Sequence, residues 1–415
     1  MNNLQRLVLN KYNFRILRKF SQQCTTTITE PPKPITFLTN QEIMVKNTVA
    51  RLATEKIGPL VRQMEDDGKI HESVLNMLFD NGLMGIEIES KYNGTESNFM
   101  NAILVIEEIS KIDPSVAVMV DIHNTLVNNL FRKLGTEEQK NKYLPLLASK
   151  WVSSICISES GSGSDAFAMK TTAKKDGNSY ILNGSKMWIS NSDIADVFLV
   201  MANANPEAGY KGITMFIVER DTPGLTVGKP ERKLGLKASG TCQVHFDNVR
   251  IPETNILGKL GHGYKYVASI LNEGRIGIAA QMLGLAEGCF NATIPYTLER
   301  KQFNEPIYKF QSMQHQIARI ATEIECVRLL VYNSARLLEN GVDVQKYGAM
   351  VKYYSAEVAQ KVTINCIDWM GGVGFTQDYP QEKFYRDCKA GSIYEGTTNI
   401  QLSTIAKFIE KEYKQ

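Results

Sequence analysis

One segment near the carboxyl end combines residue types that suit acid–base chemistry. It runs Tyr394-Glu-Gly-Thr-Thr-Asn399, so that a carboxylate directly precedes a glycine. Threonine and asparagine are favoured at the start of a helix, and a helix that begins there would hold Glu395 on a rigid turn. A carboxylate fixed in this way can act as a general base. The alternative is a surface glutamate that precedes a helix, and this segment alone leaves both open.

Two further segments could contact a cofactor. The first, Cys156-Ile-Ser-Glu-Ser-Gly-Ser-Gly-Ser-Asp165, gathers small residues and backbone amides, which can approach an anionic or polar group closely. The second, Lys186–Asn191, contains Trp188, which could form a wall for a planar ring, and Ser190, which offers a hydroxyl. Each has an ordinary alternative, a flexible connector for the first and a core tryptophan for the second.

The segment Asp368–Phe375 carries three glycines, at 371, 372 and 374. It is not a dinucleotide-binding fingerprint, because it follows a helical pattern and no βαβ unit surrounds it. The five histidines are too scattered to form a zinc site, so no metal is expected. The seven cysteines show no Cys-x-x-Cys pair, which favours free thiols in a reducing compartment.

The elements that must position these segments follow from the hydrophobic pattern. Apolar residues recur at helical spacing from Asn40 to Lys56 and from Asn101 to Lys111, and a further helix is expected after Gly135 with Thr136 as its N-cap. From about residue 151 to 255 short β-branched runs alternate with turn residues, and Asp176-Gly-Asn178 predicts a hairpin. Asn183-Gly184 predicts another tight turn.

The remaining chain is helical in pattern, with long stripes at Met313–Glu339, Tyr347–Met370 and Thr398–Tyr413 that predict an antiparallel bundle. The fold class is therefore multi-domain α+β. A helical domain at 34–150 precedes a β domain, barrel or sandwich, at 151–262, and a helical bundle follows at 263–415.

Residues 1–33 are expected to be a transit peptide and linker. The first 29 residues hold five basic residues and no acid, with apolar residues between the charges, which is typical of a mitochondrial leader. The alternative is a basic leader that carries no targeting signal. The net charge of the 415 residues is only +3, so the chain lacks the strong positive electrostatic field that attracts nucleic acid. No apolar run approaches the roughly 18 residues that a membrane span needs.

Taken together, these segments resemble the acyl-CoA dehydrogenase family from about residue 40 to the carboxyl end. Cys156–Ala168 matches the first signature of the family, and Asp368–Asp387 matches the second. Within the family, Asn272–Ala280 and Trp369–Gly374 look most like the short/branched-chain, 2-methyl-branched members.

The resemblance implies a helical domain, a central β domain and a four-helix bundle, assembled as a homotetramer that binds FAD between the β domain and the bundle. Ser190 would lie near flavin N5, while Arg300 and Gln311 would reach the FAD of a neighbouring subunit. The cofactor-binding residues implied are Ile155, Cys156, Ile157, Ser158, Glu159, Ser160, Gly161, Ser162, Gly163, Ser164, Trp188, Ile189, Ser190, Arg300, Gln311, Asp368, Trp369, Met370, Gly371, Gly372, Thr397, Thr398 and Asn399.

The resemblance also implies the reaction, the dehydrogenation of an acyl-CoA to a trans-2-enoyl-CoA. Glu395 would remove the α-proton, its own N–H and a hydroxyl of FAD would stabilise the enolate oxygen, and the β-hydride would pass to the flavin. Electron-transfer flavoprotein in the mitochondrial matrix would accept the electrons. The substrate contacts implied are Ser164, Tyr210, Tyr264, Asn272, Glu273, Gly274 and Arg275.

Several alternatives remain open at this point. Isovaleryl- and long-chain members of the family carry their base directly before the arginine that corresponds to Arg275, and Gly274 at that position argues against both. A straight short-chain substrate and a non-catalytic flavin- or CoA-binding scaffold remain alternatives. A hydrolase that uses Ser158 or Ser162 lacks a Ser–His–acid pattern and a Gly-x-Ser-x-Gly elbow.

Overall fold

The computed structural model describes residues 34–414, and the described residues from Leu38 onward form one compact unit. The expected transit peptide and linker, residues 1–33, lie outside the described residues. None of the helices within residues 34–414 has both the length and the apolar character needed to cross a membrane.

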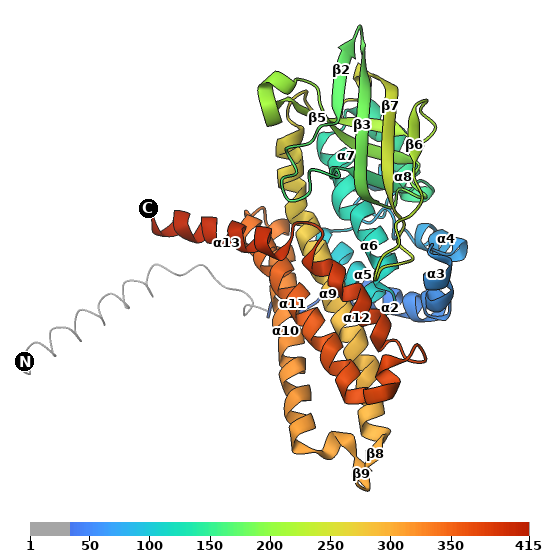
Figure 1. The fold of residues 1–415 in the computed structure, drawn as a ribbon, viewed down its shortest axis with the longest axis vertical. Coiled ribbons are helices and arrows are strands. Elements are labelled where there is room, and N and C mark those ends of the chain that lie inside the picture. Colours follow the sequence, from blue (N-terminus) through green and yellow to red (C-terminus); the bar gives the residue numbers. More distant parts are fainter. Residues whose placement is uncertain (1–33, 415) are drawn as a thin grey trace, which may run out of the picture. The chain divides into compact units, whose positions relative to one another are not determined.

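The first part of the compact unit is helical (Figure 1). Asp113-Pro114 separates two buried helices, because Pro114 ends one pattern and occupies the first turn of the next, where Asp113 caps it. Thr136 is the N-cap of the last helix in a capping box with Gln139, as its sequence predicts. The helices are α2 (Asn40–Leu52), α3 (Val61–Asp67), α4 (Glu72–Asp80), α5 (Phe99–Ser110), α6 (Pro114–Asp121), α7 (Asn129–Leu134) and α8 (Glu137–Ser149), with π-helical turns η1 (Ala53–Ile57) and η4 (Ile122–Asn128).

The middle part is a seven-stranded sheet that forms a half-barrel. Its hydrogen-bonded path runs β1-β4-β2-β3-β7-β6, with β5 paired to β4. The strands are β1 (Ser153–Cys156), β2 (Thr172–Asp176), β3 (Ser179–Ser190), β4 (Val197–Asn203), β5 (Ile213–Glu219), β6 (Leu225–Val227) and β7 (Thr241–Pro252).

Alternation along β4 shows how the sheet is buried on both faces. Val197, Leu199 and Met201 pack into the core shared with the helices. Phe198 and Val200, which point the other way, pack into a second core formed by the sheet itself. A strand with both faces buried reads as a continuous apolar run, which explains the sequence of this segment.

The predicted hairpin is confirmed, because β2 and β3 pair across Gly177. The tight turn predicted at Asn183-Gly184 is wrong. Both residues lie inside β3, where the register against β7 shifts between Leu182 and Gly184. A glycine with positive φ serves a β-bulge as readily as a turn, and Gly184 has φ 147°.

The last part consists of long helices around α9 (Gly263–Glu299), which runs from the sheet to the opposite end of the unit (Figure 1). A small hairpin joins it to α10. The described elements are β8 (Lys301–Gln302), β9 (Glu305–Pro306), α10 (Gln311–Glu339), α11 (Gln345–Met370), η8 (Gly371–Phe375), α12 (Gln381–Cys388) and α13 (Thr398–Tyr413). Helix α11 packs along α9 and also contacts α10, α12 and α13, so it is the central element of the helical part.

Candidate active site

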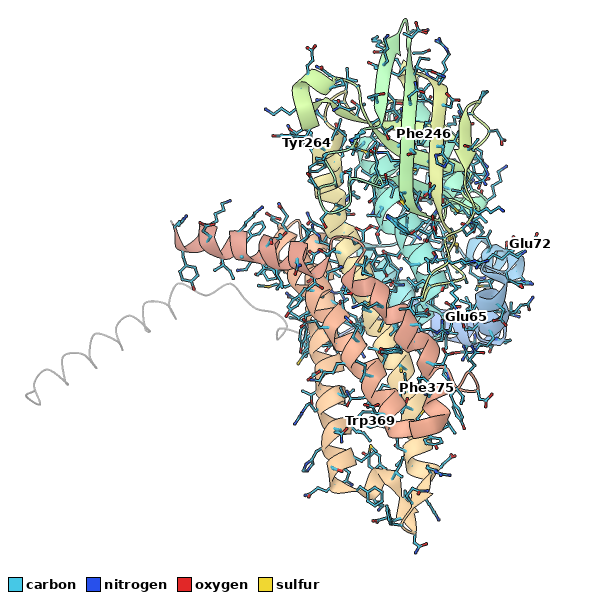
Figure 2. All side chains as sticks on the ribbon, viewed as in Figure 1. Glu65, Glu72, Phe246, Tyr264, Trp369 and Phe375 are labelled. Atoms are coloured by element: carbon cyan, nitrogen blue, oxygen red, sulfur yellow. The ribbon has the colours of Figure 1, made fainter. Side chains whose placement is uncertain are left out.

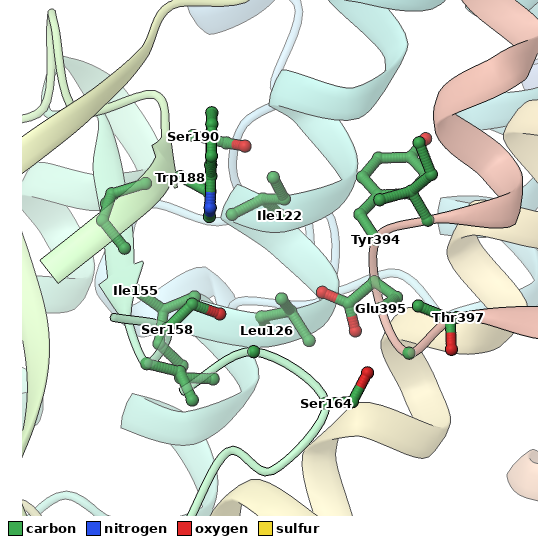
Figure 3. A pocket seen from close by; sticks show the side chains of 15 residues that line it. Ile122, Leu126, Ile155, Ser158, Ser164, Trp188, Ser190, Tyr394, Glu395 and Thr397 are labelled. Carbon is green, nitrogen blue, oxygen red and sulfur yellow. The ribbon is translucent and has the colours of Figure 1, made fainter. Parts of the chain in front are cut away.

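A cavity of about 350 Å³ lies where the helical part, the sheet and the start of α13 meet. Four segments from distant parts of the sequence form it, and Figure 3 shows the Glu395 carboxylate directed into it. Its lining residues are Ile122, Leu126, Ile155, Ile157, Ser158, Gly163, Ser164, Trp188, Ile189, Ser190, Ile393, Tyr394, Glu395, Gly396 and Thr397.

The end of β3 forms one wall through an irregularity of the strand. The register against β7 shifts between Lys186 and Ile189, and Trp188 between them has φ 64°, a conformation uncommon for residues other than glycine. Bulges of this kind re-aim side chains near functional sites. The Trp188 side chain is therefore turned out of the sheet, and the residue is 55% exposed beside the cavity.

The loop after β1 forms the opposite wall, and a buried ion pair beneath it sets its path. Lys186 Nζ lies 2.9 Å from Oε1 of Glu159 and donates to the carbonyl of Ile157 at 3.1 Å. Glu159 also accepts from Thr171, through both its backbone N–H and its hydroxyl. The Glu159 carboxylate thus faces the protein interior, and it supports the loop rather than lining the cavity.

Other side chains of this loop divide between the cavity and the interior. Ser158 and Ser164 face the cavity, whereas the hydroxyl of Ser162 donates to the carbonyl of Asp165 at 2.6 Å. The Cys156 side chain is buried in the core of the sheet. Ser160 and Gly161 are exposed at the tip of the loop.

The turn before α13 carries the carboxylate. Glu395 has φ 52° and Gly396 has φ 88°, and the Thr397 side chain caps α13. Burial raises the pKa of Glu395 to about 7, while the nearby charges of Arg275 and Lys352 act in the opposite direction. Among the described residues, buried Oε2 of Glu395 has no hydrogen-bond partner. A buried carboxylate oxygen without a partner is suited to accept a proton from a ligand.

Helix α9 passes directly behind this carboxylate at Gly274. A Cβ built on Gly274 would lie 2.9 Å from Oε2 of Glu395 and 2.8 Å from Cδ2 of Leu126. Arg275 follows, and its Nη1 donates to Oδ1 of Asn272 at 3.0 Å. Glycine at 274 therefore leaves the room that Glu395 occupies.

Glu273 points away from the cavity. It pairs with Lys133 and accepts from Asn129 Nδ2 at 2.9 Å, so it is a buried, ion-paired side chain rather than a solvated one. Together with Asn272 and Tyr264 it lines a second cavity of about 440 Å³ at the start of α11. Tyr264 contacts Tyr210 edge-on, with their ring centroids 5.0 Å apart.

Other predicted residues line neither cavity, namely Arg300, Gln311, Asp368, Trp369, Met370, Gly371, Gly372, Thr398 and Asn399. Arg300 and Gln311 flank the hairpin at the end of the long helices, far from the sheet (Figure 1). Trp369 is buried in the bundle, where its Nε1 donates to Gln316, and Figure 2 shows it well removed from Tyr264. A Cβ on Gly371 or Gly372 would meet nothing within 4 Å, so the backbone there is open to approach.

Three residues that line the cavity were not predicted, namely Ile122, Leu126 and Ile393, whereas Tyr394 and Gly396 belong to the predicted motif without a role of their own.

The cavity fits a flavin by its own chemistry. Ile155, Ile157 and Trp188 offer apolar and aromatic surface for a planar ring, and hydroxyls of Ser158, Ser164 and Ser190 surround it. A Cβ on Gly163 would meet nothing within 4 Å, which leaves the loop backbone open to a ligand.

Comparisons with known proteins agree along the whole compact unit. Family models described as the N-terminal, middle and C-terminal domains of acyl-CoA dehydrogenase match residues 39–150, 154–249 and 261–410. "Short/branched chain specific acyl-CoA dehydrogenase, mitochondrial" of Bos taurus is 58% identical over 392 residues, which are 94% of this chain and 91% of that protein.

Solved structures show the same similarity. Butyryl-CoA dehydrogenase from Megasphaera elsdenii matches with a TM-score of 0.88 and 34% identity, covering 90% of this chain and 99% of that chain. A chain in the structure described as "Electron transferring flavoprotein of Acidaminococcus fermentans" matches with a TM-score of 0.89 and 36% identity, again over 90% and 99%. The identity and its coverage, on the same three-part fold, establish that this chain belongs to the acyl-CoA dehydrogenase family.

Proposed function

We propose that this acyl-CoA dehydrogenase acts on short and 2-methyl-branched acyl-CoA thioesters of about four to six carbons, with Glu395 as its catalytic base. The observation that carries the assignment of the base is the position of Glu395. Its carboxylate is directed into the cavity, and its buried Oε2 has no hydrogen-bond partner among the described residues (Figure 3). Identity of 58% to a relative named short/branched chain specific supports the choice of substrate.

The pKa of the base suits the reaction. The α-proton of a thioester is only weakly acidic, and a base is most effective when its pKa lies near the working pH. Burial brings the pKa of Glu395 to about 7. A bound acyl group would exclude water further and increase the proton affinity of the carboxylate.

The backbone of the same residue suits the enolate oxygen. The N–H of Glu395 donates to no acceptor among residues 34–414. A free N–H beside the base is placed to donate to the thioester oxygen as negative charge develops there. Glu395 therefore serves both through its side chain and through its backbone.

FAD is the cofactor of the family, and when bound it accepts the hydride that leaves the β-carbon. Ser158, Ser164 and Ser190 would hold it by hydroxyl and backbone groups, with Trp188 against its ring. Thr397 lies at the same cavity, and its side chain already accepts from the N–H of Ile400, which fixes its orientation.

We further propose that electron-transfer flavoprotein receives the electrons in the mitochondrial matrix, as part of isoleucine and fatty-acid breakdown. The relative from Bos taurus is named mitochondrial, and residues 1–29 have the composition of a transit peptide. Trp188 is exposed at the mouth of the cavity and would give electrons a route from the cavity to the surface. A homotetramer would bring Arg300 and Gln311 to a neighbouring subunit's cavity.

The substrate proposal is tested by steady-state kinetics of the FAD-loaded enzyme on a panel of acyl-CoAs. Butanoyl-, 2-methylbutanoyl-, isovaleryl-, hexanoyl- and dodecanoyl-CoA separate the alternatives. We expect the highest kcat/KM on 2-methylbutanoyl-CoA or the short straight chains. The highest kcat/KM on isovaleryl-CoA, or on a chain of twelve or more carbons, would contradict the proposal.

A further inference from the structure

The turn that carries Glu395 has a backbone conformation that needs support from outside. Glu395 lies in the left-handed region at φ 52°, which is unfavourable for a residue with a side chain. Gly396 follows at φ 88°. Strained conformations persist only where surrounding contacts fix them.

Two buried side chains supply those contacts. Lys352 lies in the first half of α11 and donates from Nζ to the carbonyl of Gly396 at 2.6 Å. Gln401, in the first turn of α13, donates from Nε2 to the carbonyls of Glu395 and Gly396, both at 2.9 Å. Both side chains belong to fully buried residues, at 0% exposure. The two carbonyls of the turn are thus fixed from two helices.

Lys352 also places a positive charge beside the carboxylate. Within residues 34–414 no carboxylate lies at ion-pair distance from its Nζ, and Glu395 is the acid that favours its charged form. Burial lowers the pKa of Lys352 to about 8. A buried ammonium without an ion pair is costly compared with an apolar side chain of similar shape, which indicates a role beyond packing.

The other ionisable groups around Glu395 come from three elements. Arg275 on α9 is the second cation, and Asp121 at the end of α6 and Tyr394 in the same turn also interact with the carboxylate. Burial raises the pKa of Asp121 and Tyr394 well above their usual values, which disfavours their charged forms. Lys352 and Arg275 are the two cations that favour the ionised form of Glu395.

We propose that Lys352 is a positioning residue for the base: its ammonium holds the carbonyl of Gly396, and with it the turn that aims Glu395 into the cavity, and its charge favours the ionised carboxylate. This inference rests on the assignment of Glu395 as the base. Lys352 and Gln401 contribute to the turn in different ways. Lys352 supplies a hydrogen bond and a charge, whereas Gln401 supplies hydrogen bonds alone.

The test uses FAD-loaded enzyme and methylthioacetyl-CoA, in which sulfur replaces the β-carbon. Its α-proton can be removed, but it has no β-hydrogen to transfer. The enolate of methylthioacetyl-CoA, bound beside oxidised flavin, gives a long-wavelength absorbance. The pH dependence of this absorbance reports removal of the α-proton. The rate of flavin bleaching by 2-methylbutanoyl-CoA is measured in parallel.

Lys352→Met removes donor and charge, and Lys352→Gln removes the charge but keeps a donor. We expect both to move the pH midpoint of the absorbance upward by about one unit, with bleaching at pH 7 slowed about tenfold. Gln401→Met should slow bleaching without moving the midpoint. Thr363→Val is the control, since Thr363 is buried on α11 and its hydroxyl bonds within its own helix and to Cys388. We expect this variant neither to slow bleaching nor to move the midpoint.

Wild-type rate and midpoint in FAD-loaded Lys352→Met would overturn the inference. If that variant does not fold, an unmoved midpoint in Lys352→Gln would overturn it equally. Glu395→Gln distinguishes this failure from failure of the base assignment. If Glu395→Gln still forms the absorbance, Glu395 is not the base; if it does not, and the Lys352 variants behave as wild type, only the role of Lys352 is wrong.

Discussion

Gly274→Ala should slow flavin bleaching, because it places a single methyl group against the carboxylate of the base. The added Cβ would lie 2.9 Å from Oε2 of Glu395 and 2.8 Å from Leu126 Cδ2, whereas ordinary contact begins at 3.4 Å. The carboxylate and the leucine must therefore each retreat by about 0.5 Å. Because a misplacement of 1 Å can cost about 10²-fold in rate, we expect flavin bleaching to slow by roughly 10-fold or more.

The matched control is Gly348→Ala on α11, which lies on the other side of the same arginine. There the added Cβ would be 3.4 Å from the carbonyl of Asn272 and 3.8 Å from Cβ of Arg275, both ordinary contacts. Anaerobic stopped-flow mixing with 2-methylbutanoyl-CoA measures bleaching, and the ratio of FAD to protein measures cofactor retention. Wild-type bleaching in Gly274→Ala, or an equal loss in both variants, would refute the reasoning.

Three further predictions follow from the same structure. Because the base must be ionised and burial raises its pKa to about 7, kcat/KM should fall about tenfold per pH unit below pH 7, and a flat profile from pH 5 to 8 would contradict this. Because the raised pKa of Glu395 means that stability is lost as pH rises from about 4.5 to 7, Glu395→Gln should stabilise the protein by up to about 3 kcal/mol at pH 8 and by nothing near pH 4.5. Equal thermal midpoints of variant and wild type at pH 8 would count against the burial of a charged carboxylate. Arg300→Ala should lower FAD retention and make it depend on protein concentration, measured by gel filtration with flavin absorbance, and tight FAD binding by a folded monomer would exclude a shared site.

Local signals in the sequence were sufficient for much of the fold. Thr397-Thr398 marked the start of α13, and Asp176-Gly-Asn178 marked the hairpin, because in each case the deciding interaction lies within a few residues. Asn183-Gly184 was misread because a positive φ serves a turn and a bulge alike. Only pairing with β7, more than 60 residues away, decides between them.

Part of the site could be predicted from short motifs. Ser158 lies in the first family signature, Trp188 and Glu395 lie in motifs outside both signatures, and all three line one cavity. Leu126 was missed because an apolar helical residue has the same pattern whether it faces a core or a cavity. Lys352 was missed for a related reason, since its partner carbonyl is 44 residues away and a lysine in a helix normally reads as exposed.

The central claim is that Glu395, and not Glu273, removes the α-proton. Glu395→Gln keeps the shape of the side chain and removes the base, and Glu273→Gln is its matched control, because Glu273 is held by Lys133 away from the cavity. The decisive measurement is the rate of flavin bleaching by 2-methylbutanoyl-CoA in FAD-loaded variants, with acyl-CoA binding measured separately. We predict a loss of about 10²–10⁴-fold for Glu395→Gln with FAD and acyl-CoA binding retained, and a far smaller effect for Glu273→Gln. Near wild-type bleaching in Glu395→Gln together with its loss in Glu273→Gln would contradict the account.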